Sequence, residues 1–292
     1  MNRCPAQRAT VPYGNKPITV RAFCAHCDTR IKRGSFMKFV SGLYTDIGIK
    51  KSTNQDSMLL LHAMIDNCEV VFAVICDGMG GLQKGEVASA DVIHAFHQWF
   101  KERFPAICPG GRLDVNQLQQ DWSDLIDARC DAISKYGSVN GFSLGTTLTC
   151  LLIVGNQYYI ANIGDSRVYL FNNQVMLLTH DQTLVQQKID EGLLTYEQAE
   201  NDPQRSVLLQ CIGASDFVNP DFYTGPVESN AVFMLCSDGF RHLVSTDELY
   251  SYLNATRLVD QTSIEANLRE ITELLKMRRE TDNISAIAIR TF

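Results

Sequence analysis

Two apolar runs in this chain end in the same way, with an aspartate followed by a glycine. The first run leads into Asp77-Gly78 and the second leads into Asp238-Gly239. A short apolar run that stops at a turn signal is typical of a β-strand buried on both faces. Each aspartate is therefore expected at the rim of a rigid core, where its carboxylate is held in place yet reaches solvent.

A third carboxylate, Asp282, stands just before a further β-like run at residues 283–290. Asp77 and Asp282 are 205 positions apart (282 − 77), so one site that contains both must be assembled by a single folded domain. Carboxylate oxygens are the ligands that hard divalent cations such as Mg2+ and Mn2+ prefer. An Asp-Gly pair by itself usually marks only a turn, but its place after a buried strand favours a metal ligand.

Charge and hydropathy limit the partners of the chain. The net charge is −7, and residues 1–36 hold seven Lys and Arg and one acid, which leaves 19 basic and 32 acidic residues, or −13, for the rest. Such an acidic domain argues against nucleic acid, whose phosphate backbone selects for Lys and Arg. The sequence has no apolar run of about 18 residues and no secretory signal, so we expect no membrane span.

The ten cysteines are expected to be free thiols in a reducing cytoplasm, because three of them lie inside apolar runs and no export signal is present. Cys24 and Cys27 form a Cys-x-x-Cys pair. A structural zinc site needs four ligands, and only Cys4 or His26 could join this pair locally. We therefore do not expect zinc there.

Residues 1–36 differ from residues 37–292. The first segment is basic and contains Pro5, Pro12 and Pro17 without clear periodicity, so we expect a flexible arm. In the second segment, strands are predicted in consecutive blocks with helices in pairs between them. That grouping favours an antiparallel α+β fold over an alternating parallel sheet.

The predicted elements follow from hydrophobic periodicity and turn signals. The strands are expected at residues 37–44, 57–61, 69–76, 146–154, 157–163, 167–171, 174–178, 232–236 and 283–290. Helices are expected at residues 87–104 and 118–136, and a helical insert at residues 183–206. Capping-box patterns at residues 195–198, 245–248 and 262–265 predict helix starts.

Six short motifs along residues 43–290 together resemble the type-2C metal-dependent serine/threonine protein phosphatases in their bacterial form. They are GIKKSTNQDS at residues 48–57, DGMGG at 77–81, GTT at 145–147, IGDSR at 163–167, SDG at 237–239 and DN at 282–283. Each motif alone is weak, but six in order form a strong signal. The resemblance implies a central antiparallel β-sandwich flanked by helices on both sides (αββα), with a flap at about residues 183–225.

The same resemblance implies two ions, Mn2+ or Mg2+, at one end of the sandwich. By similarity, Asp77 bridges the two ions and the Gly78 carbonyl binds one of them, while Asp238 and Asp282 bind the other. Asp56 is implied to position metal-bound water from outside the ligand shell.

Several positions depart from the family pattern. Lys51 stands where the family usually has an arginine that grips the substrate phosphate, and lysine supplies charge without a bidentate fork. Gln55 replaces a common glutamate, and Met79 stands where animal members have a histidine that acts as general acid. Ser143 occupies the place where bacterial relatives put an aspartate that binds a third metal, which puts a third site in doubt. Asp181 matches another residue near that site and is a further candidate ligand.

These features predict metal-dependent hydrolysis of phosphoserine and phosphothreonine on proteins by a water that two metals activate. The expected partners are phosphorylated proteins and a cognate Ser/Thr kinase, with the enzyme a cytoplasmic monomer. One alternative is a catalytically weak relative that binds phosphoproteins as a regulatory module; another is a phosphatase specific for one regulatory phosphoprotein. Asp77, Asp238 and Asp282 favour an enzyme, whereas Lys51 and Ser143 keep the module alternative open.

Overall fold

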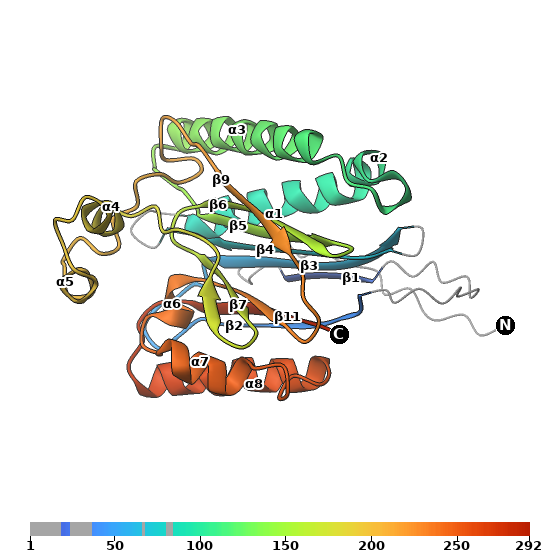
Figure 1. Cartoon of the computed structure of the whole chain (residues 1–292). Helices are drawn as coiled ribbons and strands as arrows, with labels where there is room; N and C mark the ends of the chain where they lie inside the picture. Colours follow the sequence, from blue (N-terminus) through green and yellow to red (C-terminus); the bar gives the residue numbers. More distant parts are fainter. Residues whose placement is uncertain (1–18, 24–36, 66–67, 80–83) are drawn as a thin grey trace.

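The computed structural model describes residues 19–23, 37–65, 68–79 and 84–292, which form two β-sheets packed face to face (Figure 1). Sheet A has the strand order β1-β3-β4-β5-β6-β9, with bounds Thr19–Phe23, Asp56–Ile65, Cys68–Asp77, Leu148–Val154, Gln157–Ile163 and Asp221–Pro226. Sheet B has the strand order β2-β11-β10-β7-β8, with bounds Phe39–Asp46, Ile284–Thr291, Val232–Cys236, Arg167–Phe171 and Val175–Leu177. Every neighbouring pair is antiparallel except β1 and β3.

Strand β4 shows why its sequence is a continuous apolar run. The side chains of Phe72, Val74 and Cys76 lie in the core between sheet A and its helices, whereas those of Val71 and Ile75 lie in the core between the two sheets. Because successive side chains point to opposite faces, a strand covered on both sides needs apolar residues at every position. The predicted buried strand is confirmed, and β10 is buried on both faces in the same way.

Helices cover the outer face of each sheet and give four layers (Figure 1). Sheet A is covered by α1 (Gly85–Glu102) and α3 (Val115–Asn140), which are joined through α2 (Phe104–Ile107) and the 3-10 turn η1 (Pro109–Gly111). Sheet B is covered by α7 (Thr246–Leu253) and α8 (Gln261–Met277). Each covering helix turns an apolar stripe inward, as expected of amphipathic helices. The predicted α+β sandwich with helices on both sides is confirmed.

The predicted helical insert contains α4 (Leu184–Asp190) and α5 (Tyr196–Glu200), which project from one end of the sandwich (Figure 1). The capping box that opens α5 is present, because Thr195 accepts a hydrogen bond from the Gln198 backbone and Gln198 reaches back to the Thr195 backbone. The predicted flap range ends too late. Residues from Asp221 onward belong to strand β9, which pairs with β6 and so is part of the sheet.

Two further details depart from the sequence predictions. Strand β1 lies within the predicted arm and pairs parallel with β3, and its five residues are too few to show a convincing period. The rest of the arm, including the Cys24 and Cys27 pair, lies outside the described residues. The capping box predicted at residues 262–265 is wrong, because α8 starts earlier: Asp260 is the N-cap and accepts from the Ser263 N–H at 2.7 Å.

None of the helices that the structure describes combines the length and the apolar character needed to cross a membrane.

Candidate metal centre

The predicted carboxylates meet at one end of the sandwich because the strands that carry them begin or end there. Asp56 opens β3 and Asp77 closes β4, and these two residues are direct partners in the antiparallel pair. In sheet B, Asp238 begins the short helix α6 (Asp238–Arg241) just after β10, and Asp282 stands just before β11. Strands β10 and β11 are antiparallel neighbours, so the end of one lies beside the start of the other.

Asp77 is held by the neighbouring strand of sheet A. Its N–H donates to Thr147 Oγ1 at 2.9 Å, and its carbonyl accepts from the Thr147 N–H at 2.9 Å and from Thr146 Oγ1 at 3.0 Å. Gly78 follows in a space that admits no side chain, since a Cβ would lie 2.5 Å from the Gly85 carbonyl oxygen. The Gly-Thr-Thr motif therefore fixes Asp77, and close backbone packing requires the glycine.

Asp56 joins the two sheets from a position where only 1% of its surface is exposed. Its Oδ2 accepts a hydrogen bond from Ser237 Oγ at 3.0 Å, and Ser285 also donates to the carboxylate. Ser237 directly follows β10 and Ser285 lies near the start of its neighbour β11, and the Ser285 N–H donates to Ser237 Oγ at 3.2 Å. Asp56 Oδ1 is buried and has no hydrogen-bond partner among the described residues, so it remains an acceptor for a water molecule.

Asn283 attaches the loop of residues 47–55 to the start of β11. Its Oδ1 accepts from the Gln55 N–H at 2.9 Å, and its Nδ2 donates to the carbonyls of Ile47 at 2.9 Å and Thr53 at 3.2 Å. Both the donor and the acceptor of this side-chain amide are therefore used to hold the loop. The position of this loop is thus set by the residue next to Asp282.

Lys51, on the same loop, points into the carboxylate cluster. Its Nζ lies 2.7 Å from Asp282 Oδ1, and 26% of its side chain is exposed. Burial alone would lower the pKa of Lys51, but the hydrogen bond and charge of Asp282, together with the charges of Asp77 and Asp238, raise it. Lys51 is therefore a full positive charge beside three carboxylates.

The carboxylates raise one another's pKa because they are buried together. Burial raises the pKa of Asp56 to about 7, against two serine hydrogen bonds that lower it. Burial, followed by the charges of Asp56 and Asp238, raises the pKa of Asp77 well above its ordinary value. Burial and the charge of Asp282 raise the pKa of Asp238, although Arg241 and a hydrogen bond with Asp77 oppose the shift. Concentrated negative charge of this kind favours binding of divalent cations.

The residues present fit divalent cations that keep water in their shells. Asp238 Oδ1, like Asp56 Oδ1, is buried without a hydrogen-bond partner in the described part of the chain. Within the same part of the chain, no three Asp, Glu, His or Cys side chains converge closely enough to bind one ion by themselves. Mg2+ keeps several waters and commonly takes only one or two carboxylates. Asp77, Asp238 and Asp282, with the Gly78 carbonyl, could supply the protein ligands of such ions.

The structure does not bring Asp181 into this ligand set. Asp181 Oδ1 accepts from Arg167 Nε and Oδ2 from Arg167 Nη2, both at 2.8 Å, and Oδ2 also lies 3.3 Å from Arg241 Nη2. Burial would raise the pKa of Asp181, but the two arginines lower it. Both oxygens are thus already held by guanidinium groups.

Arg241 and Asp165 contact each other next to Asp238. Arg241 lies three residues after Asp238 on α6, and its Nη2 donates to the Asp165 carbonyl at 3.1 Å. Burial and the charge of Asp238 raise the pKa of Asp165 to about 7, although Arg241 opposes the shift. Arg241 therefore offsets the charge of two buried carboxylates, Asp165 and Asp181, beside the centre.

The departures from the family pattern lie around this centre. The Gln55 side-chain amide donates to Glu86 Oε2 at 3.5 Å, and the Met79 N–H donates to the Gly145 carbonyl at 3.1 Å. Ser143 is exposed in the connection between α3 and β5, two residues before Gly145. Gly145, two residues later, is the residue whose carbonyl contacts Met79, so Ser143 lies near the centre along the chain.

Comparison with known families decides the relationship. The family model of protein phosphatase 2C matches residues 49–283, a span that includes Lys51, Asp77 and Asp282. The chain belongs to the protein phosphatase 2C family.

This phosphatase 2C chain is similar to bacterial proteins along most of its length. It is 31% identical over 210 residues to the protein phosphatase PhpP of Streptococcus pneumoniae, a match that covers 71% of this chain and 81% of that protein. The serine/threonine phosphatase of S. agalactiae is 26% identical and has a TM-score of 0.73, with 87% of this chain and 99% of that chain covered. The catalytic domain of the serine threonine protein phosphatase PstP, solved in complex with 2 manganese ions, is 26% identical with a TM-score of 0.69, covering 87% of this chain and 99% of that one.

The supporting residues of this phosphatase 2C centre were not predicted from the sequence. Ser237 and Ser285 hold Asp56, and Arg241 stands behind Asp238. The signal that could have found them is a polar residue directly at the end of a continuous apolar run, where burial requires a partner. Which partner it takes depends on the pairing of the two sheets.

Proposed function

We propose that this chain is a metal-dependent protein phosphatase in which Asp77, Asp238, Asp282 and the Gly78 carbonyl hold two divalent cations, Mn2+ or Mg2+. Its substrates are phosphoserine and phosphothreonine residues of proteins. The observation that carries the proposal is the convergence of buried, mutually repelling carboxylates from both sheets on one end of the sandwich. Its similarity to a serine/threonine phosphatase, and to a phosphatase catalytic domain solved in complex with manganese ions, supports metal-dependent dephosphorylation.

The metal ions, when bound, supply an activated water for attack on phosphorus and neutralise the phosphate oxygens. The protein contributes position and charge. Asp56, with its free Oδ1, accepts a hydrogen bond from water and so orients it. Asp77 is kept rigid by Thr147, so the geometry of the centre changes little when phosphate enters.

Lys51 is proposed to bind the substrate phosphate. Its ammonium group already faces the centre through Asp282, and a phosphate oxygen can take a donor from the same group. Because Lys51 is a point charge with rotatable donors, it attracts the phosphate without fixing its orientation. Orientation then depends on the cations and on the substrate protein.

The alternative function is a regulatory module that binds phosphoproteins and turns them over poorly. The ion pair between Lys51 and Asp282 favours this alternative, because it ties the phosphate-binding cation to a predicted ligand. Ser143, a weak ligand at the expected third-metal position, points the same way.

One experiment separates the two functions. Hydrolysis of a small aryl phosphate and of a phosphothreonine peptide is measured with and without Mn2+, after the protein has been treated with a chelator. An enzyme shows metal-dependent turnover of both compounds. Peptide binding without metal-dependent turnover of either compound would instead establish the module.

We further propose that the phosphatase acts as a cytoplasmic monomer and opposes a Ser/Thr kinase that phosphorylates the same proteins. The free state of all seven cysteines in the described ranges supports a reducing compartment. Sedimentation of the purified protein tests the monomer, and fractionation of cells tests the location.

A further inference from the structure

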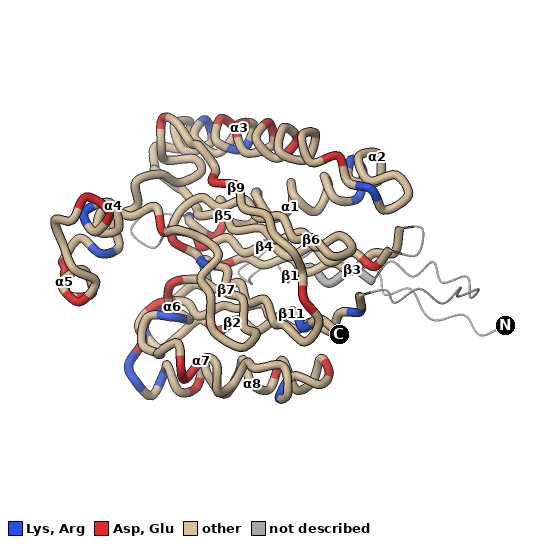
Figure 2. Tube along the Cα trace, in the orientation of Figure 1, with Lys and Arg blue, Asp and Glu red and all other residues tan. Residues whose placement is uncertain are grey.

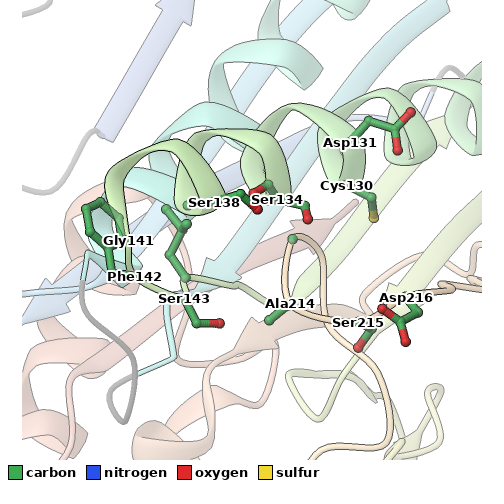
Figure 3. A pocket seen from close by; sticks show the side chains of 13 residues that line it. Cys130, Asp131, Ser134, Ser138, Gly141, Phe142, Ser143, Ala214, Ser215 and Asp216 are labelled. Atoms are coloured by element: carbon green, nitrogen blue, oxygen red, sulfur yellow. Dashed lines mark hydrogen bonds between the residues drawn. The ribbon is translucent and has the colours of Figure 1, made fainter.

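A pocket of about 540 Å³ lies between the C-terminal half of α3 and the turn at residues 213–216 (Figure 3). Ser134 and Ser138 face it from α3, and Ala214, Ser215 and Asp216 face it from the turn. The volume is within the usual range of pockets that bind small molecules or single side chains, about 300–1,000 Å³. The pocket is therefore large enough to hold one long side chain with part of its backbone.

The lining of this pocket is negative or accepts hydrogen bonds. Asp131 and Asp216 supply two carboxylates, and neither is ion-paired within the described residues. The Ser138 hydroxyl donates to the Ser134 carbonyl, which leaves the Ser138 oxygen as an acceptor. Lys and Arg are absent from the described residues that line the pocket.

Helix α3 adds to this negative potential. Its C-terminal end, capped by Gly141, forms one wall of the pocket, and the last turn contains no basic residue to offset the helix dipole. Along its whole length the helix carries four aspartates, against one arginine and one lysine (Figure 2). The carboxylates, the serine oxygens and the helix end thus all favour a positively charged occupant.

The pocket adjoins the metal centre. Ser143 and Leu144 line the pocket, and the next residue, Gly145, accepts a hydrogen bond from the Met79 N–H at 3.1 Å. Met79 directly follows Gly78. A substrate whose phosphorylated residue lies at the centre can therefore place a nearby side chain in the pocket, since an extended chain advances about 3.3 to 3.6 Å per residue.

We propose that this pocket binds the side chain of a lysine or arginine that stands within a few residues of the phosphorylated residue in the substrate protein. This inference rests on the proposed function and names the class of its substrates. A metal ion is a less suitable occupant, because no three His, Cys, Asp or Glu side chains in the described ranges converge to bind one. A guanidinium or ammonium group instead matches separated carboxylates and hydroxyls, because its several donors point in different directions.

The test uses phosphothreonine peptides in an alanine background, with one arginine moved through up to four positions on either side of the phosphothreonine. Arginine at one position, or at two adjacent ones, is expected to raise kcat/KM by about two- to fivefold, the size expected of exposed ion pairs. The double variant Asp131→Asn/Asp216→Asn should lose this preference. Asp124→Asn, an exposed position on the same helix but outside the pocket, should keep it.

A charge-swap variant makes the test independent of folding defects. Asp216→Lys should prefer glutamate where the natural protein prefers arginine. Equal kcat/KM for all arginine positions, or an equal loss on the arginine and alanine peptides in the double variant, would overturn the inference. Fluorescence anisotropy of the same peptides measures the preference even if the chain lacks turnover. Absent hydrolysis of aryl phosphate with Mn2+ would instead contradict the proposed function.

Discussion

Lys51 Nζ lies 2.7 Å from Asp282 Oδ1, so the cation proposed to bind phosphate is paired with a carboxylate proposed to bind metal. In this arrangement Lys51 offsets the charge of the cluster, and a divalent cation bound by Asp282 would compete with it for that carboxylate. Lys51 therefore acts on metal affinity and on phosphate affinity in opposite directions.

The Lys51→Ala variant should lose about 10- to 100-fold in kcat/KM on a phosphothreonine peptide, because a hydrogen bond to a charged group is lost. Its affinity for Mn2+ should rise, because Asp282 no longer has a competing cation. Steady-state kinetics and calorimetry measure the two effects. Lys50→Ala, at the exposed neighbouring position, is the control, and an equal loss in that variant would contradict a specific role for Lys51.

The Asp77→Asn variant should bind Mn2+ so weakly that calorimetry detects no tight site, and its turnover should fall at least about 100-fold, because Asp77 is proposed to be a ligand of the catalytic cations. Asp56→Asn should keep its metal and lose about 10- to 100-fold in turnover, as expected for a residue outside the ligand shell. Full turnover in Asp77→Asn would refute its proposed role as a metal ligand.

The Ser143→Asp variant should bind one more Mn2+ ion than the natural chain, because a carboxylate then stands where a hydroxyl is a weak ligand. The number of ions is counted by calorimetry or by metal analysis after dialysis. Ser134 lines the same pocket from α3, so the Ser134→Asp variant is the control for the effect of an added negative charge alone. The proposed role of residue 143 as the position that controls a third metal site would be wrong if both variants gained an ion or if neither did.

The Arg241→Met variant should lower the free energy of unfolding by about 3 kcal/mol, because it leaves Asp165 and Asp181 buried without this partner. Urea denaturation monitored by circular dichroism measures the change. Arg278→Met, which breaks an exposed ion pair with Glu248, should cost much less. Similar losses in the two variants would show that Arg241 stabilises the fold no more than an exposed ion pair does.

The pH dependence of stability should report the raised pKa of Asp56. In the metal-free protein, Asp56 keeps its proton up to about pH 7, whereas the unfolded chain releases it near its ordinary value. The folded state therefore binds more protons between these limits, and stability falls as the pH rises toward 7. Asp56→Asn removes this contribution, so in chelator its stability relative to the natural chain should be higher at pH 7.5 than at pH 5.

The sequence predicted those site residues whose position follows from the pattern of a single strand. Asp77 and Asp238 follow runs that are apolar at every position, and such runs are found where a strand is covered on both faces. Asp165, Arg241 and Ser285 could not be assigned in this way, because their roles depend on contacts between distant segments. The pocket beside α3 could not be predicted for the same reason, because its two walls are about 80 positions apart in the sequence and share no sequence pattern.

Boundaries were predicted less well than the elements themselves. The start of α8 was placed at Thr262, although Asp260 caps the helix, because both positions fit the same local pattern. The family resemblance implies a flap that ends near residue 225, but the short and partly polar segment Asp221–Pro226 is strand β9. Only its pairing with β6 shows that it belongs to the sheet.

Strand β11 lies between β2 and β10 in sheet B, and Asp282 and Asn283 stand just before it. During synthesis on the ribosome, the other motifs emerge long before this segment does. Until it arrives, sheet B lacks an inner strand, the side chain of Asn283 cannot hold the loop of residues 47–55, and one proposed metal ligand is missing. A nascent chain, or a fragment cut before residue 282, would carry nearly every motif and still be inert.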